Sequence, residues 1–229
     1  MSANAQPLSV PLDDGQSVSA LLLMPPAARA CYVMAHGAGA GMTHPFMTAF
    51  ANDLGSRAIA TLRYQFPYME RGSKRPDSPK VAHATVRAAV AEASRLARGL
   101  ALVAGGRSFG GRMTSQAQAA SPLLGVRGLA FLGFPLHPAG QPSDERAAHL
   151  ADVNVPMLFL QGTRDELADL PLLSSVAERL GTRATLELID DADHSFHVPA
   201  RTGRKDAVVR TEMADLLVGW IAKVVAPAT

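Results

Sequence analysis

Cysteine is almost absent from this chain, since Cys31 is the only one among 229 residues. A single thiol cannot form an internal disulfide, which excludes the class of small secreted domains held together by disulfides. The first ten residues, MSANAQPLSV, also lack the basic and apolar segments of a secretion signal. We therefore expect a cytoplasmic protein in which Cys31, placed within an apolar run, is chemically inert.

An excess of charge of one sign is also missing. The 22 Lys and Arg residues face 20 Asp and Glu residues, for a formal net charge of +2, and no long basic stripe is present to neutralise phosphates. The longest strongly apolar runs, Leu100 to Ala104 and Leu129 to Leu132, are far shorter than the ~20 residues that span a bilayer. The sequence therefore predicts neither a nucleic-acid partner nor a membrane span.

What the chain does contain is typical of a globular α/β or α+β protein, with 48% hydrophobic and 18% charged residues. Neither an internal repeat nor a linker divides it. A chain of this length buries roughly 70% of its unfolded surface, so its core needs no disulfide or structural metal. We expect one domain over residues 1–229, and composition does not predict its oligomeric state.

The order of apolar segments predicts the fold class. Leu8 to Leu12 and Val18 to Met24 flank a turn sequence, Asp13 to Gln16, and indicate an antiparallel start. Further strands are expected over Ala30–Ala35, Arg57–Arg63, Leu100–Ala104, Val126–Gly133, Val155–Leu160 and Ala184–Ile189. Helices are expected over Pro45–Leu54, Pro79–Ala97, Gly110–Ala119, Pro171–Leu180 and Asp206–Val225. Near-continuous apolar strands that alternate with helices predict a doubly wound, mostly parallel sheet of about eight strands.

A candidate nucleophile lies between an expected strand and an expected helix. Gly106-Arg107-Ser108-Phe109-Gly110 matches the pattern G-x-S-x-G, in which the serine occupies a sharp, strained turn and the flanking glycines leave room for it. The alternative is a serine in an ordinary glycine-rich turn. The strand and helix around the motif favour the nucleophile elbow, with Ser108 as the nucleophile.

A serine nucleophile needs a histidine base, and the base needs a carboxylate that fixes its tautomer. Asp165 follows the strand expected to end at Leu160, and His194 follows the strand expected to end at Ile189. Because the carboxyl ends of parallel strands lie at one edge of a sheet, Ser108, Asp165 and His194 are the expected triad. His197 competes for the role of base, and Glu166 and Asp169 compete less strongly for the role of acid.

An acyl-transfer site also needs N–H donors for the developing oxyanion. The residue after the nucleophile, Phe109, supplies one, and Ala38 in the glycine-rich turn His36-Gly37-Ala38 is the expected second donor. His36 directly follows a buried strand. We therefore interpret it as a residue that orders the loop by hydrogen bonding to the backbone, and not as a member of the triad.

From Ala30 to Trp220 the chain resembles the α/β-hydrolase superfamily, and in particular its small dienelactone-hydrolase-like branch. The resemblance rests on the motifs HGAGAG at 36–41, FPYME at 66–70, GGRSFGGR at 105–112, GFPLHP at 133–138 and QGTRD at 161–165. It implies the α/β-hydrolase fold, with Ser108, Asp165 and His194 as nucleophile, acid and base, but it implies no substrate. Dienelactone hydrolases use cysteine where this chain has Ser108, so their activity is not carried over.

Two other stretches resemble nucleotide-binding motifs but lack residues that those motifs require. The stretch from Gly37 to Met42 approaches a dinucleotide fingerprint but ends on methionine, and no acidic residue ends the next strand. The stretch from Gly106 to Met113 approaches a P-loop, yet Arg112 stands where lysine is needed and Met113 where a hydroxyl must bind magnesium. The seven histidines are dispersed without metal-ligand spacing. We expect no cofactor and no metal.

The surroundings of the motif bear on the substrate. Only about twenty residues, Phe134 to Asn154, separate the strands where larger relatives insert a helical cap, which predicts a minimal cap or none and an open site. Arg107 and Arg112 flank the elbow, and we expect them to brace it through ion pairs. An apolar acyl pocket could draw on Met and Phe side chains, although core packing is the more common role of such residues: Met34, Met42, Phe46, Met47 and Phe109.

These features together predict a serine hydrolase of the esterase or thioesterase type, which cleaves a small-molecule ester or thioester through an acyl-enzyme intermediate. The alternative is a non-catalytic interaction module on the same fold. The resemblance includes eukaryotic relatives associated with chromatin complexes, which is what supports that alternative. An intact set of Ser108, Asp165 and His194 beside a glycine-rich loop favours the enzyme.

Overall fold

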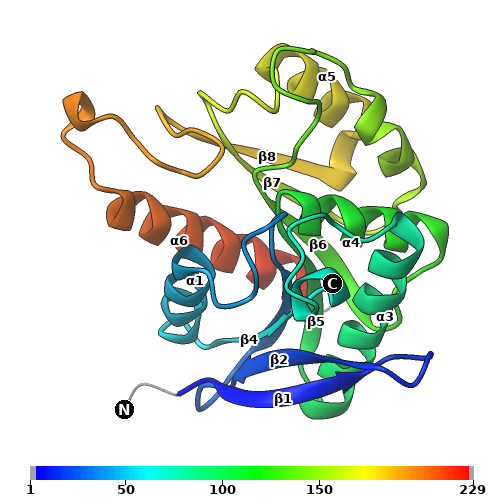
Figure 1. Cartoon of the computed structure of the whole chain (residues 1–229). Coiled ribbons are helices and arrows are strands. Elements are labelled where there is room, and N and C mark those ends of the chain that lie inside the picture. The colour runs from blue at the N-terminus through cyan, green and yellow to red at the C-terminus, as the bar shows by residue number, and fades with distance from the viewer. Residues whose placement is uncertain (1–3, 227–229) are drawn as a thin grey trace.

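A single eight-stranded sheet runs through the computed structural model, which describes residues 4–226 (Figure 1). Its strands are β1 (Gln6–Pro11), β2 (Ser17–Leu23), β3 (Ala30–Ala35), β4 (Ile59–Tyr64), β5 (Ala101–Arg107), β6 (Val126–Leu132), β7 (Met157–Gly162) and β8 (Ala184–Ile189). They lie in the order β1-β2-β4-β3-β5-β6-β7-β8. The exchange of β3 and β4 relative to chain order places β3 beside β5 in the middle of the sheet.

Strand β2 is antiparallel to both of its neighbours, β1 and β4, and the remaining neighbouring pairs are parallel. Val10 pairs with Val18 in the β1–β2 hairpin, and β2 then pairs antiparallel with β4. β3 pairs in parallel with both β4 and β5, and β6, β7 and β8 continue in the same direction. The prediction of a mostly parallel sheet of about eight strands with an antiparallel start is confirmed.

Helices cover both faces of the sheet, as the near-continuous apolar strands require. The longer helices are α1 (Pro45–Gly55), α3 (Pro79–Leu96), α4 (Phe109–Ala120), α5 (Leu170–Leu180) and α6 (Asp206–Val225). The short ones are α2 (Pro67–Glu70) and 3₁₀-helices over Glu145–Asp152, Gly181–Arg183 and Ala200–Thr202. Figure 1 shows α1 and α6 side by side on one face and α3, α4 and α5 on the other.

Strand β3 shows how the sheet divides the core, because successive side chains of a strand point to opposite faces. Cys31, Val33 and Ala35 belong to the apolar cluster on the side of α3, α4 and α5. Tyr32 and Met34 belong to the cluster on the side of α1 and α6. All six β3 residues are buried, so its carboxyl end is held rigidly from both faces.

Several strand boundaries differ from the expected ones by one to three residues, and two of these differences are examples. β4 begins at Ile59 and not at Arg57, because Ala58 has a φ of +59° and the chain is still turning there. β5 continues past Ala104 to Arg107, since Gly106 still pairs with β3 and Arg107 with β6. The second difference brings the strand directly up to Ser108.

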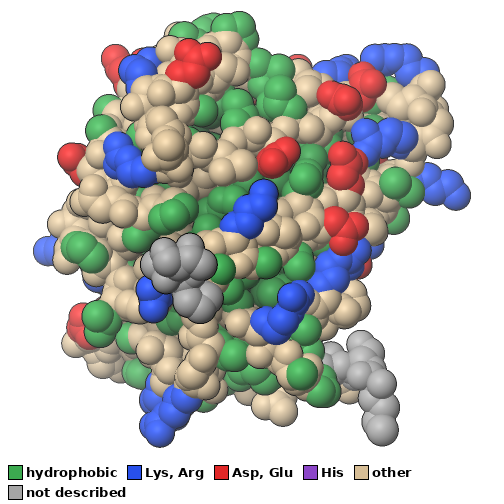
Figure 2. All heavy atoms as spheres, turned by 180° about the vertical axis from the view of Figure 1, so that it is seen from behind, with side chains coloured by type: hydrophobic (Ala, Val, Ile, Leu, Met, Phe, Trp, Pro, Cys, Tyr) green, Lys and Arg blue, Asp and Glu red, His purple; other side chains and the backbone are tan. Residues whose placement is uncertain are grey.

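Within residues 4–226, no cap domain covers the carboxyl ends of the strands. The segment after β6 holds a loop and the single 3₁₀-helix over Glu145–Asp152 before β7 begins, which confirms the expectation of a minimal cap. Among residues 4–226, no helix has both the length and the apolar character to cross a membrane. On the face drawn in Figure 2, basic and acidic side chains are interspersed among apolar and neutral ones.

Candidate active site

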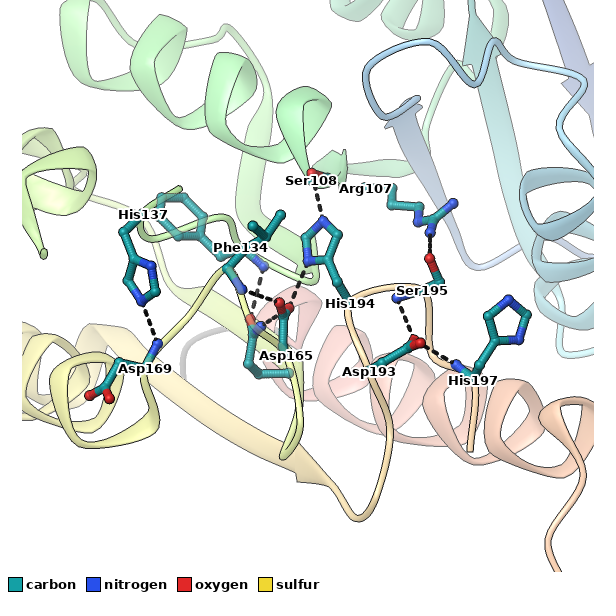
Figure 3. A network of polar contacts seen from close by, with 12 residues as sticks. Arg107, Ser108, Phe134, His137, Asp165, Asp169, Asp193, His194, Ser195 and His197 are labelled. Atoms are coloured by element: carbon teal, nitrogen blue, oxygen red, sulfur yellow. Dashed lines mark hydrogen bonds and ion pairs between the residues drawn. The ribbon is translucent and has the colours of Figure 1, made fainter. Parts of the chain in front are cut away.

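The expected site residues come from loops that follow β3, β5, β7 and β8, all at the carboxyl edge of the sheet (Figure 3). Ser108 directly follows β5, Asp165 follows β7 and His194 follows β8. Loops at this edge of an open parallel sheet are held by a rigid scaffold but keep their side chains accessible. The structure brings together side chains that are separated by 86 residues in the sequence.

Ser108 occupies a strained turn between β5 and α4, with φ of +49° and ψ of −118°. A non-glycine residue in this region persists only where its surroundings enforce it. Gly106 and Gly110 make the close approach of the neighbouring backbones feasible. A Cβ on Gly106 would lie 2.1 Å from the carbonyl oxygen of Ala35, and one on Gly110 would lie 2.6 Å from that of His36.

The side chains of Ser108, His194 and Asp165 form one hydrogen-bonded line (Figure 3). Nε2 of His194 lies 2.8 Å from Oγ of Ser108, and Nδ1 lies 2.7 Å from Oδ2 of Asp165. Because a carboxylate can only accept, Nδ1 carries the proton and Nε2 of the neutral ring accepts from the serine hydroxyl. This is the arrangement in which a histidine can remove a proton from a serine.

The carboxylate of Asp165 is buried and fully hydrogen-bonded, with its side chain 0% exposed. Oδ1 accepts from the N–H of Leu167 at 2.8 Å, and Oδ2 accepts from the side-chain amide of Gln161 as well as from His194. Gln161 is itself held, because its Oε1 accepts from the N–H of Phe134 at 2.9 Å. Sequence reasoning missed Gln161, although its position four residues before Asp165 at the end of β7 placed it at the same edge.

Asp193 shapes the loop that carries His194, and it was also missed. Its Oδ1 accepts from the N–H of Ser195 at 2.7 Å and from the N–H of His197 at 3.0 Å. The competing base, His197, points away, with its side chain 67% exposed and its Nδ1 bonded to Asp206. The geometry therefore favours His194 over His197 as the partner of Ser108.

The two rival acids lie elsewhere. Asp169 is the N-cap of α5, where its side chain accepts from the N–H of Leu172, and Glu166 is exposed. The backbone N–H of Asp169 donates to Nε2 of His137 at 2.7 Å, which ties the segment after β6 to the segment that carries Asp165. Neither rival carboxylate bonds to His194 among the described residues.

His36 orders the loop after β3, as expected. Its Nε2 accepts from the N–H of Phe66 at 3.1 Å and its Nδ1 donates to the carbonyl of Gly37 at 2.8 Å. Burial lowers the pKa of His36 to about 4, so the ring is neutral at ordinary pH. Because the C=O and N–H of a trans peptide point in opposite directions, the bond to Gly37 also fixes the direction of the Ala38 N–H.

In the part of the chain that the structure describes, the two expected oxyanion donors have no other partners. Ala38 N–H donates to no other residue within 4–226, and Phe109 is the first residue of α4, where a helix N–H has no carbonyl of its own to bond. The loop and the elbow lie against each other, since a Cβ on Gly37 would be 3.7 Å from Cβ of Ser108. Both N–H groups thus belong to backbone segments that meet at Ser108.

The side chains considered for an acyl pocket divide between core and site. Met34 and Met47 are fully buried between the sheet and α1, which agrees with ordinary core packing. Phe109 packs edge-on against Phe66, with ring centroids 5.3 Å apart. Phe46 lines a cavity beside the site, and a second cavity lies on the other side of His194, where it is lined by Arg164, Glu166, Leu167, Asp193 and Ser195.

The expectation of ion pairs at Arg107 and Arg112 is wrong. Within residues 4–226 neither guanidinium pairs with a carboxylate, and both Nε atoms are buried without a hydrogen-bond partner. For Arg107, the two carboxylates whose charges act on it, Asp193 and Asp165, already accept other hydrogen bonds. Nη2 of Arg107 donates instead to Oγ of Ser195 at 2.9 Å.

In the described part of the chain, no group of three or more His, Cys, Asp or Glu side chains is arranged to hold a metal ion. Burial raises the pKa of the Cys31 thiol to about 12. The thiolate is the reactive form, so Cys31 is inert at ordinary pH.

Comparison with known proteins places the chain in a family. Residues 28–222 match the family described as "Alpha/beta hydrolase domain". The chain belongs to the α/β hydrolases. Its fold is similar to that of a dienelactone hydrolase from Anabaena variabilis, at a TM-score of 0.79 and 21% identity over 99% of this chain and all of the other.

Two further solved structures share the fold of this α/β hydrolase. One is a serine hydrolase without lid from Xanthomonas campestris, at a TM-score of 0.73 and 22% identity over 99% of this chain and 97% of the other. The other is Est1E from Butyrivibrio proteoclasticus with ferulic acid bound, at a TM-score of 0.71 and 16% identity over 92% of this chain and 99% of the other. The family match identifies an α/β hydrolase, and these likenesses show that its fold is shared by the three solved structures.

Proposed function

We propose that this α/β hydrolase is a serine hydrolase that cleaves a small ester or thioester through an acyl-enzyme formed on Ser108. The observation that carries the proposal is the continuous line from Ser108 Oγ through His194 to Asp165, with the serine held in a strained turn. An interaction module has no use for such strain, whereas a nucleophile needs its hydroxyl exposed at a sharp turn.

In the first half of the reaction, Oγ of Ser108 attacks the carbonyl carbon of the substrate while Nε2 of His194 takes the hydroxyl proton. The tetrahedral intermediate collapses, its bond to the leaving oxygen or sulfur breaks, and His194 gives that proton to the departing group. A water molecule then repeats the sequence on the acyl-enzyme and releases the acid and free Ser108. Asp165 keeps the proton on Nδ1 and stabilises the imidazolium that forms in both halves.

The negative charge that develops on the carbonyl oxygen would be met by the N–H groups of Phe109 and Ala38. Donors of this kind, fixed before the reaction begins, contribute about 3–4 kcal/mol each to transition-state stabilisation. Support comes from the His36 bond that fixes the Gly37–Ala38 peptide and from the absence of other partners for Ala38 within residues 4–226. Small substrates fit a site over which residues 4–226 form no cap domain.

A fluorophosphonate probe tests the proposal directly, because only an activated serine reacts with it rapidly. We expect rapid labelling of the wild type at Ser108 and none of the Ser108→Ala variant. Ser115 is a matched control, since its hydroxyl also contacts a histidine, His149, at 2.7 Å, but lies within α4 without backbone strain. Ser115→Ala should label normally. A wild type that neither labels nor hydrolyses p-nitrophenyl esters would favour the interaction module.

A further inference from the structure

A cavity of about 350 Å³ lies near the Ser108–His194 pair, although neither of these two residues lines it. Arg107 and Ser195, which line it, are the chain neighbours of Ser108 and His194, and Figure 3 shows them bonded to each other beside the pair. Phe46 and Phe196 give the cavity an apolar wall. Its remaining charged or titratable side chains are three basic ones and one acidic one: His44, His197, Arg210 and Asp206.

Arg107 is the unusual member of this cavity because its positive charge is buried without a counter-ion within residues 4–226. The residue is only 9% exposed, its Cζ lies 5.2 Å from the centre of the Phe46 ring, and its single hydrogen bond goes to the neutral hydroxyl of Ser195. A buried charge is ordinarily paired with an opposite charge, since desolvation alone costs several kcal/mol. Burial accordingly lowers the pKa of Arg107 from its ordinary value, against the attraction of Asp193 and Asp165.

The carboxylates around the cavity already have partners. Asp53 pairs with Arg210 at 2.6 Å, and Asp206 bonds to His197 and to the N–H of Val198. Asp193 accepts from two backbone N–H groups of its own loop. The guanidinium of Arg107 is therefore the charge at this cavity that lacks an anion within the described chain.

We propose that Arg107 is the anion-binding residue of a substrate subsite, and that the esters this enzyme hydrolyses carry a carboxylate that docks in the cavity beside it. A guanidinium binds a carboxylate through directed, charge-assisted hydrogen bonds, which are stronger than neutral ones. Phe46 and Phe196 would hold the short chain between the carboxylate and the reacting carbonyl. This inference rests on the proposed function for its catalytic consequence, but the binding of the anion does not require hydrolysis.

Two p-nitrophenyl esters of equal acyl length test the subsite. The hemiglutarate ends in a carboxylate and the pentanoate in a methyl group. For the wild type we expect kcat/KM to be at least about tenfold higher for the hemiglutarate than for the pentanoate. In Arg107→Met the ratio of the two values should fall to about one. Arg164→Gln is the matched control, because this exposed arginine lines the cavity on the other side of His194, and the ratio should be unchanged.

The carboxylate could instead belong to the alcohol side of the ester, and a second pair of substrates separates the two cases. Carboxymethyl butyrate carries the charge on the leaving group, and ethyl butyrate is its neutral counterpart. A preference for carboxymethyl butyrate that depends on Arg107 places the anion with the leaving group, and one for the hemiglutarate places it with the acyl group. Absence of both preferences overturns the proposal.

A binding measurement keeps this test separate from the test of the reaction itself. The Ser108→Ala variant should bind glutarate in calorimetry but not glutaramide, and Arg107→Met in the same background should lose glutarate binding. If wild-type protein hydrolyses neutral esters and Ser108→Ala does not bind glutarate, the subsite is wrong and the hydrolase assignment stands. If Ser108→Ala binds glutarate and the wild type hydrolyses no ester, the reaction is wrong and the subsite stands.

Should Arg107→Met fail to fold, the wild type and a charge-conserving variant still decide the question. Glutarate should inhibit pentanoate hydrolysis by the wild type competitively, and glutaramide should not. Arg107→Lys retains the charge without the planar guanidinium. Its preference for the hemiglutarate over the pentanoate should therefore be weaker than that of the wild type but still present. Equal inhibition by glutarate and glutaramide contradicts the proposal.

Discussion

The side-chain amide of Gln161 donates a hydrogen bond to Oδ2 of Asp165, the same oxygen that faces Nδ1 of His194. Its carbonyl meanwhile accepts from the N–H of Phe134, in the segment after β6. The orientation of the acid is thus fixed by a neighbouring strand end as well as by its own loop. Gln161 acts through Asp165, so we regard it as a positioning residue.

Gln161→Glu should make activity depend on pH in a new way. When protonated, the introduced carboxyl can donate to Asp165 and accept from Phe134 N–H as the amide does, but when ionised it repels the neighbouring carboxylate. At low pH we expect kcat of the variant to be close to that of the wild type at the same pH. As the introduced group ionises, kcat should fall about tenfold or more relative to the wild type, as measured in a pH–kcat profile. The buried Gln118, whose Oε1 accepts from Leu123 N–H far from the site, is the control, and Gln118→Glu should leave the shape of the profile unchanged.

The two histidines of the loop after β8 should differ sharply in their effect. His194→Ala removes the group bonded to Ser108 and should lower kcat by several orders of magnitude. His197→Ala removes an exposed ring that bonds to Asp206 and should lower kcat by no more than about tenfold. Steady-state kinetics on a short p-nitrophenyl ester measures both, and a larger loss from His197→Ala would mean that the base is misassigned.

The open site predicts how activity depends on acyl length for neutral esters. Methylenes that extend past the cavity stay in water and contribute none of the ~0.8 kcal/mol that a buried methylene supplies. We expect kcat/KM to peak at about two to six acyl carbons and then to level off. The series is measured below micelle-forming concentrations, and a steady rise to about twelve carbons would reveal an apolar tunnel.

Gly106→Ala should be strongly destabilising. Gly106 has a φ of +140°, and the added Cβ would lie 2.1 Å from the backbone oxygen of Ala35, which cannot move without separating β3 from β5. We expect a loss of more than about 3 kcal/mol in the free energy of unfolding, or no folded protein. Gly219 lies in α6, and a Cβ added there would meet nothing within 4 Å. Gly219→Ala should therefore raise stability by up to about 1 kcal/mol in denaturant titrations, and equal effects of the two changes would contradict the argument.

The free energy of unfolding should decrease as the pH is lowered, and His36 should account for part of this decrease. Burial lowers its folded-state pKa from 6.5 to about 4, so between these values the unfolded chain binds a proton that the folded protein does not. The stabilisation is complete above pH 6.5 and is lost as the pH falls toward 4, by roughly 3 kcal/mol in all. In His36→Gln, which keeps a neutral donor and acceptor at every pH, the free energy of unfolding should fall less steeply over this window. Identical slopes for the two proteins would show that His36 is not held neutral.

Local sequence determined most of the fold and the order in which the candidate site residues follow the strands. The alternation of apolar strands and helices can be predicted from neighbouring residues alone. Three elements accordingly have the bounds that were expected: Ala30–Ala35, Ala184–Ile189 and Asp206–Val225. The assignment of Ser108, Asp165 and His194 to catalysis stays a prediction, but its geometric requirement was also local. Each residue had to follow a strand, and parallel strands end at one edge.

Tertiary structure alone decided which side chains complete the site. Gln161 and Phe134 are 27 residues apart, and Arg107 and Ser195 are 88 residues apart, and no periodicity encodes contacts of that range. The failure of the expected ion pair at Arg107 has the same origin. Whether a charge is paired depends on the distance to carboxylates elsewhere in the chain and on the partners those carboxylates already have, and both quantities exist only once the chain has folded.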